Sequence, residues 1–186
     1  LWREFYLHTL FDFPRVSRHR PFKENTDKIQ WRNAPDNLAA WQQGQTGIPI
    51  VDAGMRQMRA TGWMHNRVRM ITAMFLCKNL LIDWRLGESW FMQHLIDGDL
   101  AANNGGWQWC ASTGMDAVPY FRIFNPVSQS QKFDPNGDYI RQWVPELAHL
   151  DAESIHDPYA KNLDLELDYP KPVSYTHLRA HETRGN

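Results

Sequence analysis

Helix-like spacing between residues 64 and 82 constrains the fold more than any other feature of this chain. Apolar residues recur there at intervals of three and four positions, at Met70, Met74, Cys77 and Leu81, and this is the spacing of one face of an α-helix. No stretch alternates apolar and polar residues as a half-buried strand would. We therefore predict an all-α domain of packed, irregular helices.

Proline, glycine and turn residues predict where the other helices begin and end. Pro35 and Pro49 suit the first turn of a helix, whereas Thr61-Gly62 suits an end and Pro14 a stop. We expect helices over residues 1–10, 35–41, 49–60, 64–82 and 87–96, irregular polar chain over 15–35, a turn over 44–49, and acidic, loop-rich chain after residue 143.

The two ends of the sequence differ from the rest of it. The chain has 186 residues and opens on Leu1 rather than Met, so we expect a piece of a longer protein that is large enough for one domain. Residues 174–186 have no periodicity and resemble a translated sequencing adapter. We therefore predict one domain over residues 1–173 and exclude 174–186 from the reasoning about the fold.

Composition excludes several classes of protein. Cys77 and Cys110 are the two cysteines, and they form neither a disulfide framework nor a metal-ligand spacing, so we expect a reduced intracellular setting and no metal. No apolar run approaches the ~20 residues that span a bilayer. The net charge is −1, but residues 1–85 carry +6 and residues 86–186 carry −7. This asymmetry allows either a local basic surface or only an unevenly charged solvated one.

The passage Asp97–Trp109 combines residues that helix packing does not require. It holds two carboxylates, two neighbouring asparagines, the pair Gly105-Gly106 and two tryptophans. Each glycine would weaken a helix interior by roughly 1 kcal/mol relative to alanine, and Asp and Asn compete with the helical backbone for hydrogen bonds. We therefore expect an irregular segment that closes around a polar heteroaromatic ligand, with the indoles offering flat faces to it.

Four passages together carry a resemblance to a known family. They are Trp2–Tyr6 (WREFY), residues 61–70 (TGWMHNRVRM), Asp97–Trp109 and residues 120–126 (YFRIFNP). The chain from Leu1 to about Val173 resembles the FAD-binding domain of the photolyase/cryptochrome family, and it is most similar to the class I cyclobutane pyrimidine dimer photolyases. This resemblance implies an irregular multi-helix domain and light-driven DNA repair, in which excited reduced FAD donates an electron to a pyrimidine dimer flipped out of DNA.

The resemblance implies a set of flavin-binding residues. Asp97 and Asp99 would lie against the flavin, Asn103 would lie beside its N5 atom, and Arg69 would pair with Asp97. A buried charge needs such a partner, although an ordinary helix-to-loop salt bridge is the alternative interpretation of this pair. The full set implied for the cofactor is Arg3, Trp63, Arg69, Asp97, Asp99 and Asn103.

The resemblance also implies a substrate pocket. Trp2 and Trp109 would line it, since stacking on aromatic walls recovers ~1–3 kcal/mol per base. Met70 would pack on the dimer, Asn66 would hydrogen-bond to it, and Arg67 and Gln129 would contact the DNA backbone. The alternative for Met70 is a place in the core of its helix.

A second group of indoles matches the family's electron-transfer chain. Trp107 would lie nearest the flavin, Trp84 would be intermediate and Trp31 would lie at the surface, although each could equally be a core aromatic residue. Trp41, Trp90 and Trp143 match no role. For His65 we expect hydrogen bonding rather than acid–base work.

Further expectations follow from the same resemblance. The cofactors would be FAD and a folate- or deazaflavin-type antenna chromophore held by an N-terminal domain that this sequence does not include. The phosphate clamp for FAD would lie upstream of Leu1, so we expect this piece alone to be inactive. The partner would be DNA containing cyclobutane pyrimidine dimers, and the protein would be a cytoplasmic, nucleoid-associated bacterial monomer. The alternatives are a cryptochrome-type photoreceptor with the same pocket, and a flavin-free structural or DNA-binding helical module.

Overall fold

The computed structural model describes residues 1–120, 122–160 and 167–173 of the chain. Within these residues the secondary structure consists only of helices and turns, which confirms the predicted all-α class. The α-helices are α1 (Trp2–Asp12), α2 (Pro35–Gln43), α3 (Pro49–Thr61), α4 (Asn66–Met74), α5 (Trp84–His94), α6 (Leu100–Ala111), α7 (Pro126–Phe133) and α8 (Asp138–Trp143). None of the described helices is long and apolar enough to cross a membrane.

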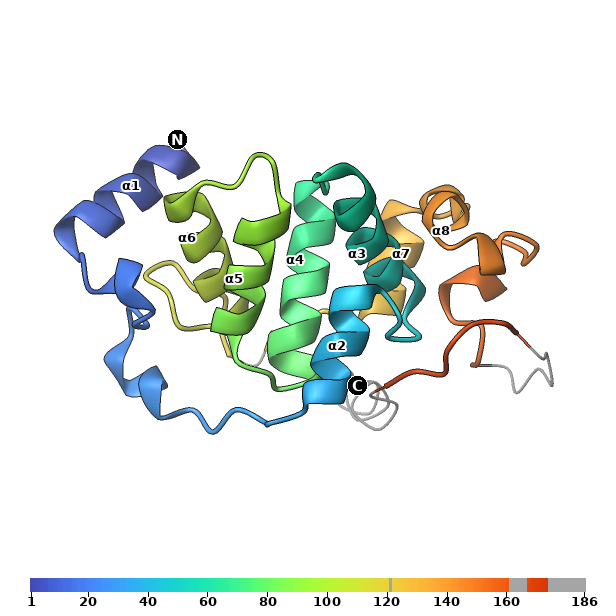
Figure 1. The fold of residues 1–186 in the computed structure, drawn as a ribbon, viewed down its shortest axis with the longest axis horizontal. Helices are drawn as coiled ribbons and strands as arrows, with labels where there is room; N and C mark the ends of the chain where they lie inside the picture. The colour runs from blue at the N-terminus through green and yellow to red at the C-terminus, as the bar shows by residue number, and fades with distance from the viewer. Residues whose placement is uncertain (121, 161–166, 174–186) are drawn as a thin grey trace.

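The helices form a row with a different element at each end. In Figure 1, α6, α5, α4 and α3 follow one another across the molecule, α1 lies beyond α6, and α8 lies beyond α3. Direct packing joins α1 to α6, α6 to both α4 and α5, α4 to α3, and α3 to α8. The predicted irregular segment consists of two short 3-10 helices, η1 (Val16–Arg18) and η2 (Glu24–Lys28), and it runs along one edge towards α2.

Two apolar clusters hold this row together. The larger one contains the fully buried Trp41, Met55, Met74 and Leu76, and it fills the space among α2, α3, α4, α5 and α6. The smaller one joins Ala53 of α3 to α8 and to the loop-rich chain beyond it. Burying a side chain of this size contributes about 1.5–3 kcal/mol, so these clusters supply the main stabilisation of the domain.

A buried carboxylate in α3 anchors the chain segment 169–173. Asp52 is fully buried, and it accepts hydrogen bonds from the Thr46 backbone nitrogen at 2.7 Å, the Thr46 hydroxyl at 2.6 Å and the Gly47 nitrogen at 3.0 Å. The Tyr169 hydroxyl donates to the same carboxylate. The Val173 nitrogen then donates to the Thr46 carbonyl oxygen at 2.9 Å. The late segment therefore lies directly against the start of α3.

Side-chain caps explain where the structure differs from the predicted helix limits. The His65 Nδ1 atom accepts from the Arg67 nitrogen at 3.1 Å, so α4 begins at Asn66 rather than Met64. His65 thus uses one ring nitrogen to cap α4. After α4 the chain forms a π-helical turn, η3 (Phe75–Asn79), and Leu81 has a positive φ of 54°, so the predicted helix stops before residue 82. Asp83 caps α5 in the same way, which starts that helix three residues before the predicted Gly87.

The expectation of irregular chain across Asp97–Trp109 is wrong, because most of this passage is helix α6. Asp99 caps the helix by accepting from the Ala102 nitrogen at 2.9 Å. A Cβ atom on Gly105 would lie 2.2 Å from the ring of Tyr6 in α1. Glycine therefore permits the close contact between α1 and α6, and this tertiary packing outweighs the low helix propensity of glycine.

Candidate functional site

A pocket with both polar and apolar lining residues opens among α4, α5, α6 and the loop that precedes α6, and we call it the polar pocket after its charged and amide side chains. Its empty volume is about 590 Å³. Its lining includes seven of the residues predicted from the sequence, Asn66, Arg69, Met70, Asp97, Asp99, Asn103 and Trp107, together with Phe91, Leu95 and Cys110. The helical turns of α4 and α6 place these side chains on facing surfaces. The structure thus brings together seven of the predicted flavin, substrate and electron-transfer residues.

The Arg69–Asp97 ion pair lies at one side of this polar pocket. Arg69 Nη2 lies 2.8 Å and 3.0 Å from the two carboxylate oxygens of Asp97, and Arg69 Nε donates to the Met64 carbonyl oxygen at 2.7 Å. The Asp97 side chain is 47% exposed and the Arg69 side chain 24%. The second bond fixes the guanidinium to the start of α4, so the pair connects α4 to the loop before α6.

Asp99 and Asn103 form the entrance to α6. Asp99 uses one oxygen to cap the helix, and Arg3 of α1 lies 3.6 Å from the other oxygen. Arg3 is predominantly exposed and does not line the polar pocket. One turn into the helix, Asn103 Nδ2 donates to the backbone oxygen of Glu88 in α5 at 2.9 Å. The Asn103 side chain is therefore held in one orientation at the pocket wall.

Gly106 leaves an open space in the wall of the pocket. It lies in α6 and lines the pocket, and a Cβ atom built on it would meet nothing within 4 Å. Gly105 beside it faces the crowded contact with Tyr6 instead. The two adjacent glycines therefore serve different purposes, because one permits helix packing and the other leaves room for a flat molecule against the backbone.

Trp107 forms the buried wall of the pocket. Its ring lies 4.9 Å from that of Phe91 and 6.0 Å from that of Trp41, both in edge-on geometry. A Cβ atom on Gly87 of α5 would lie 2.1 Å from the Trp107 ring. Trp41, which matched no role in the sequence, is fully buried and donates its indole hydrogen to the Thr72 carbonyl oxygen at 3.1 Å. These contacts fix the Trp107 indole firmly in place.

The other two members of the predicted indole chain lie outside the pocket. Trp84 is buried in the larger apolar cluster, and the Arg85 guanidinium lies 5.1 Å from the centre of its ring. Trp31 is partly buried and packs against the same cluster. Exposure thus falls from Trp31 to Trp84 and Trp107, while Trp107 alone of the three lines the polar pocket.

Trp109 and Trp2 do not line the polar pocket that Met70 lines, and their predicted role in the substrate pocket stays a prediction. Trp109 follows Trp107 by two positions in α6, so the two indoles point roughly 200° apart around the helix. Trp109 lines a second, shallow pocket together with Tyr6. Trp2 is 60% exposed at the start of α1, where its ring lies 6.1 Å from that of Tyr6.

Trp63 also lies apart from the polar pocket, because α4 begins only after it. It is 43% exposed and lines a third hollow of about 810 Å³, which Arg67 and Phe133 also line. The Arg67 guanidinium lies 4.5 Å from the centre of the Phe133 ring. Gln129 lies one turn before Phe133 on α7 and is partly buried. The structure thus places the two predicted DNA-backbone contacts, Arg67 and Gln129, around α7.

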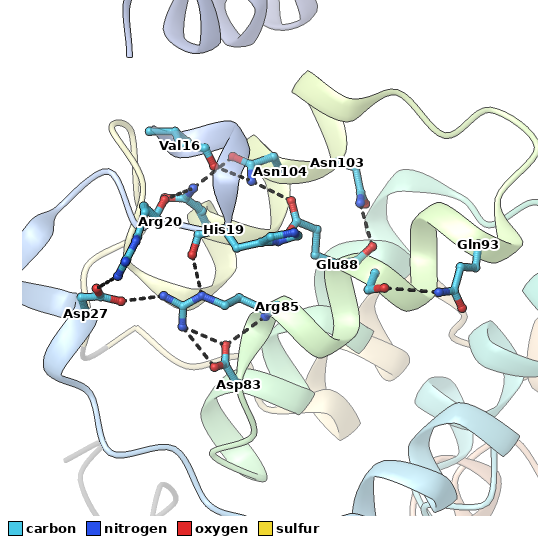
Figure 2. Close-up of polar contacts among 12 residues, drawn as sticks. Val16, His19, Arg20, Asp27, Asp83, Arg85, Glu88, Gln93, Asn103 and Asn104 are labelled. Carbon is cyan, nitrogen blue, oxygen red and sulfur yellow. Dashed lines mark hydrogen bonds and ion pairs between the residues drawn. The ribbon is translucent and has the colours of Figure 1, made fainter. Parts of the chain in front are cut away.

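The sequence analysis missed the polar residues behind the pocket. Glu88, Asn104 and Gln108 are almost completely buried. Asn104 Nδ2 donates to a Glu88 carboxylate oxygen at 2.6 Å, and Gln108 Nε2 donates to Asn104 Oδ1 at 3.0 Å. Figure 2 shows the part of this network between α5, α6 and the residues around η1. The spacing of Asn104 and Gln108, four residues apart, was the available signal, since such residues share a helix face.

The chemistry of the pocket favours binding over acid–base or nucleophilic catalysis. Burial raises the pKa of the Cys110 thiol to about 12, so this lining residue stays protonated and unreactive at neutral pH. The remaining polar lining consists of one ion pair, a cap carboxylate and two asparagine amides. Together with an open glycine and an indole, this arrangement suits a planar ligand with polar edges that exchanges electrons.

Comparisons with known proteins agree with this geometry. Residues 1–184 match the family model described as the FAD binding domain of DNA photolyase. The chain is 60% identical over 175 residues to the deoxyribodipyrimidine photo-lyase of Escherichia coli, and this match covers 93% of the chain but 37% of that protein. A class III photolyase of Agrobacterium tumefaciens is similar at a TM-score of 0.88 and 46% identity, over 98% of this chain and 40% of that one.

A cryptochrome is similar as well. The structure of the Synechocystis cryptochrome matches 84% of this chain and 34% of its own, at a TM-score of 0.75 and 43% identity. The chain therefore spans between about a third and two fifths of the length of these relatives.

Proposed function

The chain belongs to the family of FAD-binding domains of DNA photolyases, and from this premise we propose that it forms the flavin pocket of a light-driven DNA repair enzyme. The substrate would be DNA that contains cyclobutane pyrimidine dimers. The observation that carries the proposal is the polar pocket, because it unites an ion pair, an oriented asparagine, an open glycine and a buried indole on one surface.

The lining residues fit an isoalloxazine ring. Gly106 leaves the backbone of α6 open, so a flat ring can lie against it. Asn103 and the Arg69–Asp97 pair present hydrogen-bonding groups at the edges of that space. In this proposal Asp99 caps the start of α6, and the guanidinium of Arg3, which belongs to α1, offsets the negative charge of Asp99. Trp63 is outside this lining, so we assign it no direct contact with the ring.

Bound FAD in its reduced state supplies the electron that splits the dimer. The chain would contribute electron donors for restoring that state, since an indole ring can be oxidised by one electron. Trp107 lines the pocket, Trp84 is equally buried, and Trp31 is partly exposed. Phe91 and Gly87 hold the Trp107 ring against the pocket wall.

The substrate groups would surround this pocket. Asn66 and Met70 lie on its α4 side, within 3.9 Å of each other, and would contact the flipped dimer. Trp2 and Trp109 would supply stacking surfaces from α1 and α6. Arg67 and Gln129 would contact DNA phosphates beside α7. All of these residues come from one chain, so the proposal requires a monomer only, acting wherever bacterial DNA is accessible in the cytoplasm.

A cryptochrome-type photoreceptor with the same pocket is the second candidate, and the similarity to the Synechocystis cryptochrome favours it. The two functions differ in the substrate. A photoreceptor needs the flavin and the indoles, but it does not need residues that contact a dimer. Repair of dimer-containing DNA under blue light therefore separates them.

The test uses a hybrid protein in which residues 1–173 replace the matching segment of the E. coli photo-lyase. We expect this hybrid to bind FAD and to repair dimers under blue light. Gly106→Leu should lower the FAD affinity of the hybrid at least about tenfold, which corresponds to ~1.4 kcal/mol. In the 186-residue chain the same change should not lower stability, because leucine favours helix by up to ~1 kcal/mol over glycine.

Gly105→Ala is the matched control, one position away in the same helix. It should destabilise the chain, because the new methyl group meets the Tyr6 ring. The flavin pocket is refuted if Gly106→Leu leaves FAD affinity unchanged. FAD binding without repair would instead support the photoreceptor.

A further inference from the structure

The polar contacts behind Asn103 converge on one residue of the neighbouring helix. Asn103 donates to the backbone oxygen of Glu88 at 2.9 Å, and Asn104 donates to the Glu88 carboxylate at 2.6 Å. Figure 2 shows both bonds reaching from α6 to α5. Two consecutive residues of α6 are therefore tied to a single residue of α5.

The first of these hydrogen bonds determines which group of the Asn103 side-chain amide, the NH₂ or the oxygen, can face the pocket. The NH₂ group is committed to the Glu88 carbonyl oxygen, so the amide oxygen is the arm left for the pocket. Turning the amide over would place two acceptor oxygens against each other. At Asn103 the pocket therefore presents a hydrogen-bond acceptor, the amide oxygen, and this acceptor suits a ligand nitrogen that carries a hydrogen.

The second bond holds α6 in the required register. The Glu88 side chain is 5% exposed, and a buried carboxylate bound by an amide makes a charge-assisted hydrogen bond that is stronger than a neutral one. On its other side, Asn104 is bound by Gln108, and the Gln108 side-chain oxygen accepts from the Phe22 nitrogen at 2.8 Å. This network fixes α6 from the side that faces away from the ligand.

The charged surroundings of Glu88 come from two directions. His19 Nδ1 lies 3.5 Å from the second carboxylate oxygen, and Arg85 lies one turn earlier on α5. Arg85 is itself bound to Asp27 and Asp83. Among the described contacts, α6 presents only the neutral Asn104 to this carboxylate. Burial raises the pKa of Glu88, while Asn104, His19 and Arg85 oppose the rise.

Resting on the flavin pocket proposed above, we propose that Glu88 is a positioning residue. Its side chain locks α6 against α5 through Asn104, and this register keeps the amide oxygen of Asn103 directed into the pocket. Glu88 does not line the pocket, so it would act on a ligand there only through Asn103. Its effect is transmitted through two hydrogen bonds.

The first measurement needs no flavin. In the ¹⁵N-labelled 186-residue chain, the side-chain NH₂ signal of Asn103 is assigned by its loss in Asn103→Asp, and its hydrogen exchange with water is measured. Glu88→Leu removes the acceptor for Asn104, so exchange at Asn103 should accelerate at least about tenfold, the factor for losing a hydrogen bond to a charged group. Glu88→Gln keeps an acceptor oxygen, so its exchange rate should stay within about twofold of the wild-type rate.

Matched variants keep this test decisive. Gln93→Ala lies on the same helix, where the Gln93 side chain reaches only Ser89, and it should leave Asn103 unchanged. If Glu88→Leu does not fold, Asn104→Ala removes the same bond from the other side and should give the same acceleration. Unchanged exchange in both Glu88→Leu and Asn104→Ala overturns the proposal, as does an equal effect of Glu88→Gln and Glu88→Leu.

A second measurement uses the hybrid enzyme with bound FAD. The midpoint potential of the flavin should shift in Glu88→Leu and stay near the wild-type value in Glu88→Gln, because the orientation of Asn103 is lost only in the first. Identical potentials in all three proteins overturn the role of Glu88 towards the ligand. A hybrid that binds no FAD refutes the proposed function instead, and the exchange measurement then still decides whether Glu88 orients Asn103.

Discussion

Two buried carboxylates among the described residues, Asp52 and Glu88, differ in how completely they are bonded. Asp52 in α3 accepts from Thr46 twice, from Gly47 and from Tyr169, so both of its oxygens are occupied. Glu88 in α5 has one oxygen bonded to Asn104, while the other has no hydrogen bond and lies 3.5 Å from His19. Asp52 does not line the pocket and belongs to α3, whereas Glu88 is bonded to α6, which lines it.

This difference separates two uses of a buried charge. A carboxylate with every oxygen bonded holds chain segments together, and its removal leaves several donors unsatisfied at once. A carboxylate with one oxygen that accepts no hydrogen bond contributes less to stability, but it can orient a neighbouring helix. Substitutions at the two sites should therefore differ in the size of their effect on stability.

The largest effect is expected at Asp52. Asp52→Ala leaves buried donors from Thr46, Gly47 and Tyr169 without an acceptor, and each costs about 1–3 kcal/mol. We expect a loss of at least ~3 kcal/mol in the free energy of unfolding, measured by urea denaturation of the chain. Asp138→Ala is the control, since this side chain is 78% exposed and should change stability by less than ~0.5 kcal/mol. A loss below ~1 kcal/mol at Asp52 would remove the contrast between the sites.

A smaller loss is expected at Asn104. Asn104→Ala leaves the Glu88 carboxylate without its hydrogen bond and frees the Gln108 amide, so we expect a loss of about 2 kcal/mol by the same urea measurement. Glu88→Gln should cost less, since its amide oxygen can still accept from Asn104. If Glu88→Gln is the more costly of the two, the charge rather than the hydrogen bond holds α6 in place.

The third expected effect is a pH dependence of the stability difference between Glu88→Gln and the wild type. Because burial raises the pKa of Glu88 in the folded protein, the folded state holds this proton more tightly than the unfolded chain does. Stability from this group is therefore complete below the unfolded pKa and is lost as pH rises through the folded value. Glu88→Gln has no such titration, so stability relative to wild type should increase as pH rises above about 4.5, near the ordinary glutamate value. A constant difference between pH 4 and pH 8 would contradict this.

The smallest effect is expected at His19. This side chain is 68% exposed, and an exposed ion pair contributes about 0–1 kcal/mol. His19→Asn retains a residue type that tolerates the positive φ of 59° at this position. We expect a change within ~0.5 kcal/mol at pH 7 by thermal or urea unfolding. A loss above ~1.5 kcal/mol would show that His19 completes the bonding of Glu88, and the two carboxylates would then be alike.

Local signals predicted the helical frame well. Pro35 and Pro49 begin α2 and α3 as expected, and Gly62 ends α3 in the left-handed conformation. Proline and glycine set helix limits through their own backbone conformation, so these limits can be predicted from a single sequence. The predicted Arg69–Asp97 ion pair is also present. It could be predicted because both residues lie in passages that resemble a known family.

Long-range packing accounts for what the sequence could not show. Gly105 is accommodated in α6 because the Tyr6 ring of α1 packs against it. The residues next to Gly105 in the sequence do not indicate that contact. Trp107 and Trp109 were both expected at the ligand, but the pitch of α6 sends them to different pockets. Glu88 gave no signal at all, since its partners Asn104 and His19 lie on other elements.

The anchoring of residues 169–173 at α3 has a consequence for the order of folding during translation. Val173 and Tyr169 bond to Thr46 and Asp52, and the Lys171 backbone lies 2.5 Å from where a Gly47 Cβ would be. The ribosome synthesises this segment more than a hundred residues after the start of α3. During synthesis α3 therefore lacks the contacts with Tyr169 and Val173 until the segment has been made. Nascent chains arrested before residue 169 should therefore be cleaved by protease near residues 44–48, and chains extended beyond residue 173 and clear of the ribosome should resist. The start of α3 is thus completed by a segment that is synthesised long after it.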